Sequence, residues 1–233
     1  MSNYLRLKKM LYVVSLAAVS IVLGFIEIPW PIVTGPFSPF VKLDFSEIAI
    51  LIAIYVLGTK EAFLVVLVRT LARRIYKGFE PADLVGELLA MTASFALILG
   101  FHIIRKLLGN KEKPIIYEVS VNGTKIKPKE WIISLIINMT LLPVFMIIIN
   151  YFIGTPLYLS LFGLSESGAF HPTIFTFIKD AKVYSMFGYN VQFNLTNFFW
   201  FVVVSYTPFN MVKAALVTVL FLLIKPRMKY LEL

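Results

Sequence analysis

Polar side chains interrupt two long apolar runs in the C-terminal half of the chain, where a lipid environment makes each of them costly. Asn138 and Asn150 lie in one run, and Asn210 and Lys213 lie in the other. Asn210 and Lys213 are three residues apart, so they share one face of a helix. Amide and ammonium groups together can read the edge of a flat, polar-rimmed heterocycle. The alternative for each side chain is a hydrogen bond between neighbouring helices.

The segment 29–44 is suited to close such a site. It contains four prolines, which argue against a helix, and several aromatic residues. We expect this segment to be a lid over a pocket; an ordinary loop with aromatic side chains at the membrane interface is the alternative. The aromatic residues expected to stack on a flat ligand are Trp30, Phe40, Trp200 and Tyr206.

The composition places these residues in a membrane. The 233 residues are 59% hydrophobic and only 15% charged, and a soluble domain of this size cannot bury so much apolar surface. We predict an all-α membrane protein with one domain, residues 1–233, and six transmembrane helices. The predicted spans are about 10–28, 45–58, 60–76, 82–108, 130–153 and 197–224. The second is short, because crossing a ~30 Å hydrocarbon core takes about 20 helical residues.

The distribution of basic residues predicts an orientation. Six spans place both termini, the turn at 58–61 and the insert at 109–129 on one side, which then carries most of the 22 lysines and arginines. Because basic loops remain in the cytoplasm, we expect cytoplasmic termini, an outer lid and a multi-pass protein of the plasma membrane. No repeat relates the two halves of the chain, so the inverted-repeat architecture of many secondary transporters is not supported.

Enzymatic, metal and nucleic-acid functions find no support. The chain has no cysteine, and its two histidines, His102 and His171, have no partner at metal-ligand spacing. There is no phosphate-cradling glycine loop and no nucleophile motif. We therefore expect no enzyme, no metal and no cofactor. The basic residues lie at the ends of apolar runs, which is typical of orientation in a bilayer and not of nucleic-acid binding.

Charged and small residues near the first four spans have structural explanations. Asp83 and Glu87 follow the basic residues Arg73 and Arg74 closely, and we expect them to form ion pairs. In the first span, small residues offer a smooth surface to a partner helix. Packing within the same bundle is the alternative for these small residues, which are Ala17, Ala18, Ser20 and Gly24.

One motif resembles a known family. The sequence Pro39-Phe-Val-Lys-Leu-Asp-Phe-Ser-Glu-Ile is similar to the PFLK-x-DFS-[DE]-IP signature of the riboflavin-specific S components of energy-coupling factor (ECF) transporters. Ala49 stands where that signature has proline. Asn150-Tyr151 with Pro156, and Pro208-Phe-Asn-Met-Val-Lys, agree further with the family.

The resemblance implies an S component that captures riboflavin from outside and docks on a transmembrane coupling subunit driven by two ATPase subunits. By the same resemblance, Asn150, Asn210 and Lys213 would bond the isoalloxazine ring. The lid would close above it and contribute Trp30, Phe40, Lys42, Leu43 and Asp44.

Docking in this family uses a small-xxx-small pattern on the first helix. Here its place is taken by Ala17, Ala18 and Ser20, without the strict spacing. Two other functions are kept as alternatives. One is an S component for another small nutrient. The other is a self-sufficient, ion-coupled carrier or channel whose path is lined by Arg69, Glu87 and Lys213.

Overall fold

The computed structural model of the chain describes residues 3–30, 42–109, 114–116, 126–186 and 189–230. Within them, the helices are α1 (Asn3–Leu23), α2 (Ser46–Val56), α3 (Thr59–Lys77), α4 (Pro81–Leu107), α5 (Pro128–Ile149), α6 (Thr155–Leu161), α7 (Ile174–Phe177) and α8 (Leu195–Ile224). A π-helical turn, Asn150–Gly154, joins α5 to α6, and a 3-10 helix, Lys225–Tyr230, extends α8. Strands β1 (Ile28–Pro29) and β2 (Lys42–Leu43) pair antiparallel, as do β3 (Tyr184–Met186) and β4 (Tyr189–Val191).

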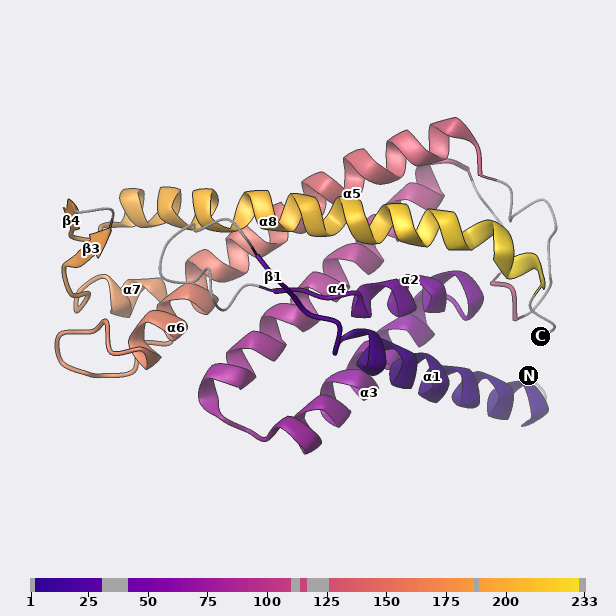
Figure 1. Cartoon of the computed structure of the whole chain (residues 1–233), viewed down its shortest axis with the longest axis horizontal. Coiled ribbons are helices and arrows are strands. Elements are labelled where there is room, and N and C mark those ends of the chain that lie inside the picture. Colours follow the sequence, from indigo (N-terminus) through magenta and orange to yellow (C-terminus); the bar gives the residue numbers. More distant parts are fainter. Residues whose placement is uncertain (1–2, 31–41, 110–113, 117–125, 187–188, 231–233) are drawn as a thin grey trace.

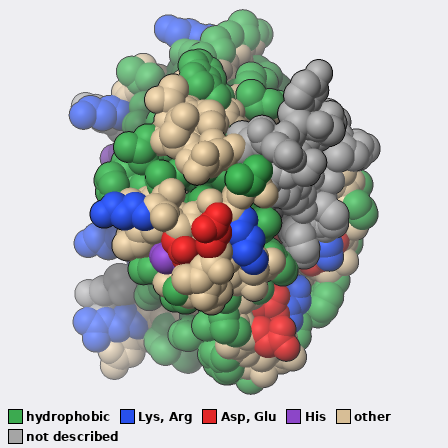
Figure 2. Space-filling view, turned by 90° about the vertical axis from the view of Figure 1, so that its left-hand side faces the viewer, with side chains coloured by type: hydrophobic (Ala, Val, Ile, Leu, Met, Phe, Trp, Pro, Cys, Tyr) green, Lys and Arg blue, Asp and Glu red, His purple; other side chains and the backbone are tan. Residues whose placement is uncertain are grey.

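The helices form an elongated bundle (Figure 1). The long helix α8 packs against α5, which also packs against α4, while α1, α2 and α3 form a second group. The start of α1 and the end of α8 lie at the same end of the molecule, and α6, α7 and the β3–β4 hairpin lie at the opposite end. Figure 2 looks onto that opposite end, where acidic and basic side chains lie among apolar ones.

Helix ends follow from local sequence chemistry. Gly58 and Gly78 flank α3 at its two ends. Their φ angles are 108° and 91°, which residues other than glycine rarely adopt. Helix α4 begins at Pro81, whose missing N–H would lack a partner there anyway. Asn194 caps α8 because its side chain accepts hydrogen bonds from the backbone N–H groups of Thr196 and Asn197.

The fold is mostly helical, as predicted, but the count of six spans is not confirmed. Within the described residues, three helical segments are long and apolar enough to cross a membrane: Pro81–Leu107, Pro128–Leu161 and Leu195–Met228. Helices α1 and α3 do not qualify because charged residues occupy part of each. Helix α2 has 11 residues, or roughly 16 Å, so it covers about half of the hydrocarbon core.

Two predicted boundaries differ from the structure. The first helix ends at Leu23, five residues before the predicted end, because a turn at Gly24 leads into β1. The fifth predicted span ends at 153, whereas the helix continues through the π turn to Leu161. Pro156 does not stop it, since proline is tolerated in the first turn of α6.

Asn138 ties the three longest helices together. Its Nδ2 donates a hydrogen bond to Thr218 Oγ1 of α8 over 2.9 Å, and both side chains are buried. Gly100 of α4 faces this amide so closely that a Cβ at Gly100 would lie 2.3 Å from Asn138 Oδ1. The interhelical alternative for Asn138 is therefore the one observed.

We predict that Gly100→Ala destabilises the protein by roughly 1–3 kcal/mol, the usual cost of overpacking a well-filled interior. The measurement is thermal unfolding of the purified protein in detergent. The control is the double variant Gly100→Ala/Asn138→Ala, in which the added methyl group no longer meets the amide. An equal cost of Gly100→Ala with and without Asn138 would contradict the explanation.

Candidate functional site

A cavity of about 550 Å³ lies between the end of α3, the first half of α4, the end of α5, the middle of α8 and the helix α6. Its volume is within the usual range for small-molecule sites, which is about 300–1,000 Å³. Asn150, Asn210 and Lys213 all line it, so the structure brings together the three polar residues on which the sequence analysis depends.

The π-helical turn positions Asn150. This wider turn begins at Asn150, whose side chain is fully buried and whose Nδ2 donates to the carbonyl oxygen of Met146 over 2.8 Å. A Cβ on Gly154 would lie 2.9 Å from Asn150 Oδ1, so glycine makes room for the amide. Thr155 Oγ1 donates a long hydrogen bond of 3.5 Å to the same oxygen, and a carbonyl oxygen can accept a second bond from a ligand.

Asn210 is held in a similar way on α8. Its Nδ2 donates to the carbonyl oxygen of Tyr206 over 2.8 Å, within its own helix. Tyr206 itself lines the cavity, and its hydroxyl lies 3.3 Å from Thr155 Oγ1. Both amides thus use their nitrogen on the backbone and are fixed in orientation, which is the pre-organisation that a selective polar site needs.

Lys213 has acidic partners that lie far from it in the sequence. Its Nζ is 3.4 Å from Glu47 Oε1 and 3.7 Å from Asp44 Oδ2. The Lys213 ammonium and two hydrogen bonds from Ser46 stabilise the carboxylate of Asp44 in this buried position. Lys213 is therefore an ammonium already balanced by carboxylates, with its longer contacts leaving donor capacity for a ligand.

Behind Lys213, Glu47 forms a buried ion pair with Arg69. Both side chains have 0% exposure, and Arg69 Nη1 donates to Glu47 Oε2 over 2.9 Å. Ser94 of α4 donates to the same carboxylate oxygen and accepts from Arg69 Nη2. Ser20 of α1 donates to the carbonyl oxygen of Ser46. The charged centre therefore connects α1, α2, α3 and α4 with the lysine in the cavity.

The described ends of the lid segment close one side of the cavity. Trp30 packs edge-on against Phe209, with ring centroids 5.5 Å apart, and Leu43 completes this apolar cluster. Lys42 and Asp44 line the cavity directly, whereas Trp30 and Leu43 act through Phe209, which does line it. Phe40 and the rest of the predicted lid, residues 31–41, lie outside the described residues.

The cavity also contains residues that sequence analysis did not assign to it. Tyr158 of α6 and Phe162, which directly follows this helix, line it with their rings nearly parallel, at an interplanar angle of 5°. Their i, i+4 spacing was visible, but both residues lie between the predicted spans 130–153 and 197–224. Trp200, expected to stack on a ligand, does not line the cavity and is 59% exposed.

The predicted ion pairs between the end of α3 and the start of α4 are present at the edge of the cavity. Arg73 Nε and Arg74 Nη2 lie 3.6 and 3.5 Å from Glu87 Oε2, and Arg74 Nη1 lies 3.9 Å from Asp83 Oδ2. We expected these ion pairs to have a structural role. The four residues that form them also line the cavity.

The small residues of α1 do not share one face. Ala17 and Ser20 are 1% and 0% exposed and face the interior of the bundle. Ala18 lies on the exposed side of α1. Of the three residues predicted to dock a partner, only Ala18 is therefore on the outer surface of this protein.

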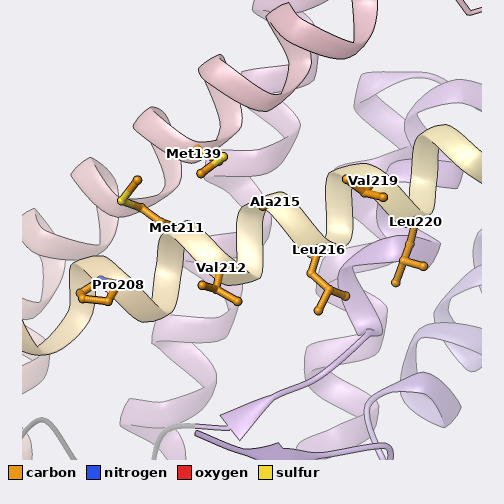
Figure 3. A pocket seen from close by; sticks show the side chains of 8 residues that line it. All are labelled: Met139, Pro208, Met211, Val212, Ala215, Leu216, Val219 and Leu220. Atoms are coloured by element: carbon orange, nitrogen blue, oxygen red, sulfur yellow. The ribbon is translucent and has the colours of Figure 1, made fainter. Parts of the chain in front are cut away.

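A second hollow, of about 590 Å³, lies on the surface between α5 and α8 (Figure 3). Its lining is apolar throughout: Met139, Pro208, Met211, Val212, Ala215, Leu216, Val219 and Leu220. A surface groove of this kind in a membrane helix pair offers no group that could orient a polar ligand, so the candidate site is the polar cavity.

Ser167, His171 and Asp180 meet in the segment between α6 and α8 but do not form a catalytic arrangement. His171 Nε2 lies 2.7 Å from Asp180 Oδ2, and Ser167 donates to the same oxygen. The bonds from Ser167 and then from His171 lower the pKa of Asp180. Since serine and histidine both bond to the aspartate, the histidine is not placed to activate the serine. The hydrogen bonds among these three residues instead stabilise the conformation of this segment.

Comparisons with known proteins found similarities in sequence and in fold. The profile of a family described as "ECF transporter, substrate-specific component" matches residues 8–225. Two curated relatives, each named riboflavin transporter RibU, are 27% identical to this chain. The one from Streptococcus thermophilus aligns over 65% of this chain and 62% of its own length, and the one from Staphylococcus aureus over 70% and 74%. The chain thus matches less than two thirds of the first relative.

A solved structure of the S component of a bacterial ECF transporter has the same fold. The TM-score is 0.62, the sequence identity is 23%, and the comparison covers 96% of both chains.

We predict that Glu47→Gln destabilises the protein by roughly 3–5 kcal/mol, because it leaves the Arg69 guanidinium buried without its carboxylate. The measurement is unfolding in detergent. The matched control is Glu61→Gln, which removes the partner of Lys9 from a pair whose side chains are 20% and 10% exposed. We expect a smaller loss there, and similar losses at the two sites would contradict a special role for the buried pair.

Proposed function

Because the chain belongs to the family of ECF transporter substrate-specific components, we propose that it binds riboflavin as the S component of a vitamin importer. The family consists of substrate-binding components of transporters, not of enzymes. Riboflavin is supported by the names of the two relatives, both riboflavin transporters, and by the sequence signature at 39–48.

The observation that carries this proposal is the convergence of Asn150, Asn210 and Lys213 on one cavity. The isoalloxazine ring system is flat and has carbonyl and imide groups along one edge. Fixed amides and an ammonium match such an edge with both donors and acceptors. The aromatic rings of Tyr206 and Phe209, which line the same cavity, provide apolar surface for its faces.

We further propose that six segments cross the membrane, with the termini in the cytoplasm and the cavity open to the outside. Support comes from the positive-inside count and from the position of α1's start and α8's end at the same end of the molecule. The short helix α2 then crosses only part of the hydrocarbon, and the lid segment continues its path. Helix α3 can cross the membrane although it contains charged residues, because Arg69 is paired with Glu47 inside the bundle.

Transport requires an energy source, and no nucleotide-binding motif occurs in the chain. In the proposed assembly, a transmembrane coupling subunit and two ATPase subunits provide it. The surface offered to the coupling subunit is the exposed side of α1 around Ala18, while Ala17 and Ser20 shape it from within by letting α1 approach α2 closely.

The alternative of a self-sufficient carrier is disfavoured because the ionisable residues that would line its path are held in ion pairs. Arg69 has no exposed surface and is bound to Glu47, and Glu87 is held by two arginines. Groups fixed in this way do not form a continuous route for an ion. Uptake of riboflavin into liposomes by this chain alone, without ATPases, would restore the carrier as the function.

We predict that the purified protein binds riboflavin and that Lys213→Ala weakens binding by roughly 1–3 kcal/mol, as expected for loss of a charge-assisted hydrogen bond. Quenching of flavin fluorescence measures the affinity. The matched control is Met211→Ala, on the outer side of the same helix and outside the polar cavity, which should leave the affinity unchanged. An unaltered affinity of Lys213→Ala would remove this lysine from the site.

We also expect riboflavin to stabilise the protein selectively. A ligand at 100 times its Kd raises the free energy of unfolding by about 2.7 kcal/mol, which a thermal-shift assay detects. Thiamine, pantothenate and a queuosine precursor serve as the comparison ligands. Stabilisation by one of these and not by riboflavin would retain the S-component family and replace the substrate.

A further inference from the structure

Five aromatic rings form a continuous patch at the end of the bundle that carries α7, opposite the two termini (Figure 1). Phe175 of α7 packs against Phe152 of the π turn, with ring centroids 6.2 Å apart. The contacts continue from Phe152 to Tyr151 and from there to Phe199 of α8, at 5.0 and 5.6 Å. Trp200 adjoins Phe199, again at 5.6 Å. We call these five residues the aromatic patch.

The aromatic patch faces outward although it is apolar. Phe175 and Trp200 are 61% and 59% exposed, and Phe152 and Phe199 are exposed as well. Tyr151 lies between them and is partly buried. The rings come from three elements that are far apart in the sequence, so the fold gathers them into one surface. A joined apolar surface of this kind indicates contact with a membrane or with another protein.

Helices α5 and α8 place the aromatic patch at a defined distance from the other end of the bundle. There Lys225, at the end of α8, forms an ion pair with Glu130 in the first turn of α5, which gives both helices a common polar level. Tyr151 lies 21 residues after Glu130, and Trp200 lies 25 residues before Lys225. At about 1.5 Å per residue, these separations correspond to about 31 and about 37 Å along the helices.

These lengths match the thickness of a bilayer. The hydrocarbon core is ~30 Å thick, and the headgroup layers bring the total to about 40–45 Å. With the polar level at one boundary of the core, Tyr151 reaches the other boundary. Trp200 lies at that boundary or in the headgroup layer next to it, because transmembrane helices are usually tilted.

The distribution of charge agrees with this level. Between the polar level and the aromatic patch, α5 and α8 contain a single charged residue, Lys213, which is buried and faces carboxylates inside the bundle. Beyond the patch, exposed charged side chains return in the segment between α6 and α8, at Glu166, Lys179 and Lys182. The aromatic patch therefore lies where an apolar stretch of helix gives way to a polar surface.

Lipid suits this surface better than a second copy of the chain. Trp and Tyr are enriched where hydrocarbon meets headgroups, since their rings are apolar and their N–H and O–H groups are polar. The two helix lengths place the patch at that boundary independently of each other. A contact between two copies of the chain would require no such agreement with the thickness of a bilayer.

We propose that the aromatic patch is an interfacial anchor, which binds the headgroup layer of the bilayer and holds α7 on the membrane surface. Because Asn150 lines the polar cavity and directly precedes Tyr151, the anchor also fixes the level of the cavity in the bilayer. This role of the patch goes beyond the proposed binding of riboflavin and does not depend on which ligand the cavity receives.

The first test measures the depth of Trp200 in the full chain, reconstituted in phosphatidylcholine vesicles. The chain has three tryptophans, so Trp30→Phe/Trp131→Phe leaves Trp200 as the only one. Lipids brominated close to the headgroup should quench its emission at least about twofold more strongly than lipids brominated close to the terminal methyl group, because the indole ring lies at the interface.

The second test measures α7 without changing a tryptophan. The chain has no cysteine, so Phe175→Cys provides a single attachment site for a nitroxide spin label. The ratio of its collisions with oxygen, which enters lipid, to those with a water-soluble nickel chelate reports its depth. The matched control is Glu166→Cys, at an exposed position of the same segment outside the patch. We expect the ratio at 175 to exceed that at 166 at least about threefold, as for a helix embedded in the headgroup layer.

Three results would overturn the anchor. Trp200 emission that responds to aqueous iodide but to neither brominated lipid places the patch in water. Emission that responds to none of the quenchers means that protein covers the patch, and a cross-linked dimer would then identify the occupant as a second copy. Equal ratios at 175 and 166 exclude α7 from the membrane surface. Riboflavin binding, measured on the unaltered protein, tests the proposed function separately from all of these results.

Discussion

The ion pair between Glu47 and Arg69 is the interaction on which the rest of the structure depends. Neither side chain has exposed surface, so each charge relies on its partner and on Ser46 and Ser94 for the solvation that water would supply. Helices α2, α3 and α4 provide these groups. Their relative positions are thus fixed by a requirement for complete charge compensation, which is stricter than apolar packing alone.

The same carboxylate connects that centre to the cavity. Glu47 offers one oxygen to Arg69 and the other to Lys213 of α8, while Asp44 balances the lysine from the side of β2. The short sequence Asp44-Phe-Ser-Glu47 therefore has two roles, since it anchors α2 in the bundle and sets the electrostatic environment of the cavity. This double use explains why a motif at the edge of the lid is followed at once by a buried helix.

Much of the fold could be predicted from the sequence, because it depends on local signals. Apolar runs bounded by Gly58, Gly78 and Pro81 gave the starts and ends of α3 and α4 to within a residue or two. The partners of Lys213 and Arg69 could not be predicted in this way, because they lie on helices far apart in the chain. Nor could the extension of α5 into α6, since Pro156 ordinarily indicates a break and a π turn has no strong sequence signal.

The cost of polar groups in lipid selected Asn138 together with Asn150, Asn210 and Lys213, and the family resemblance then pointed to the last three, which line the cavity. The aromatic and arginine walls were not predicted. Tyr158 and Phe162 lie between two predicted spans, where no helix was predicted, and Arg73 and Arg74 had a sufficient explanation as ion-pair partners. A side chain that already has a structural role gives no separate sequence signal for a second role in a cavity. The predicted contribution of Phe40 lies in the part of the chain that the structure does not describe.

The π turn at Asn150–Gly154 has a consequence for how such a cavity can diversify. It places an extra residue in one turn of an otherwise continuous helix. Loss of one residue there would rotate α6 by about 100° about its axis and carry Tyr158 and Phe162 away from the cavity. The side chains of the helix before Asn150 would keep their directions. A single-residue deletion or insertion can therefore exchange one wall of the cavity for another without disturbing the membrane-embedded bundle.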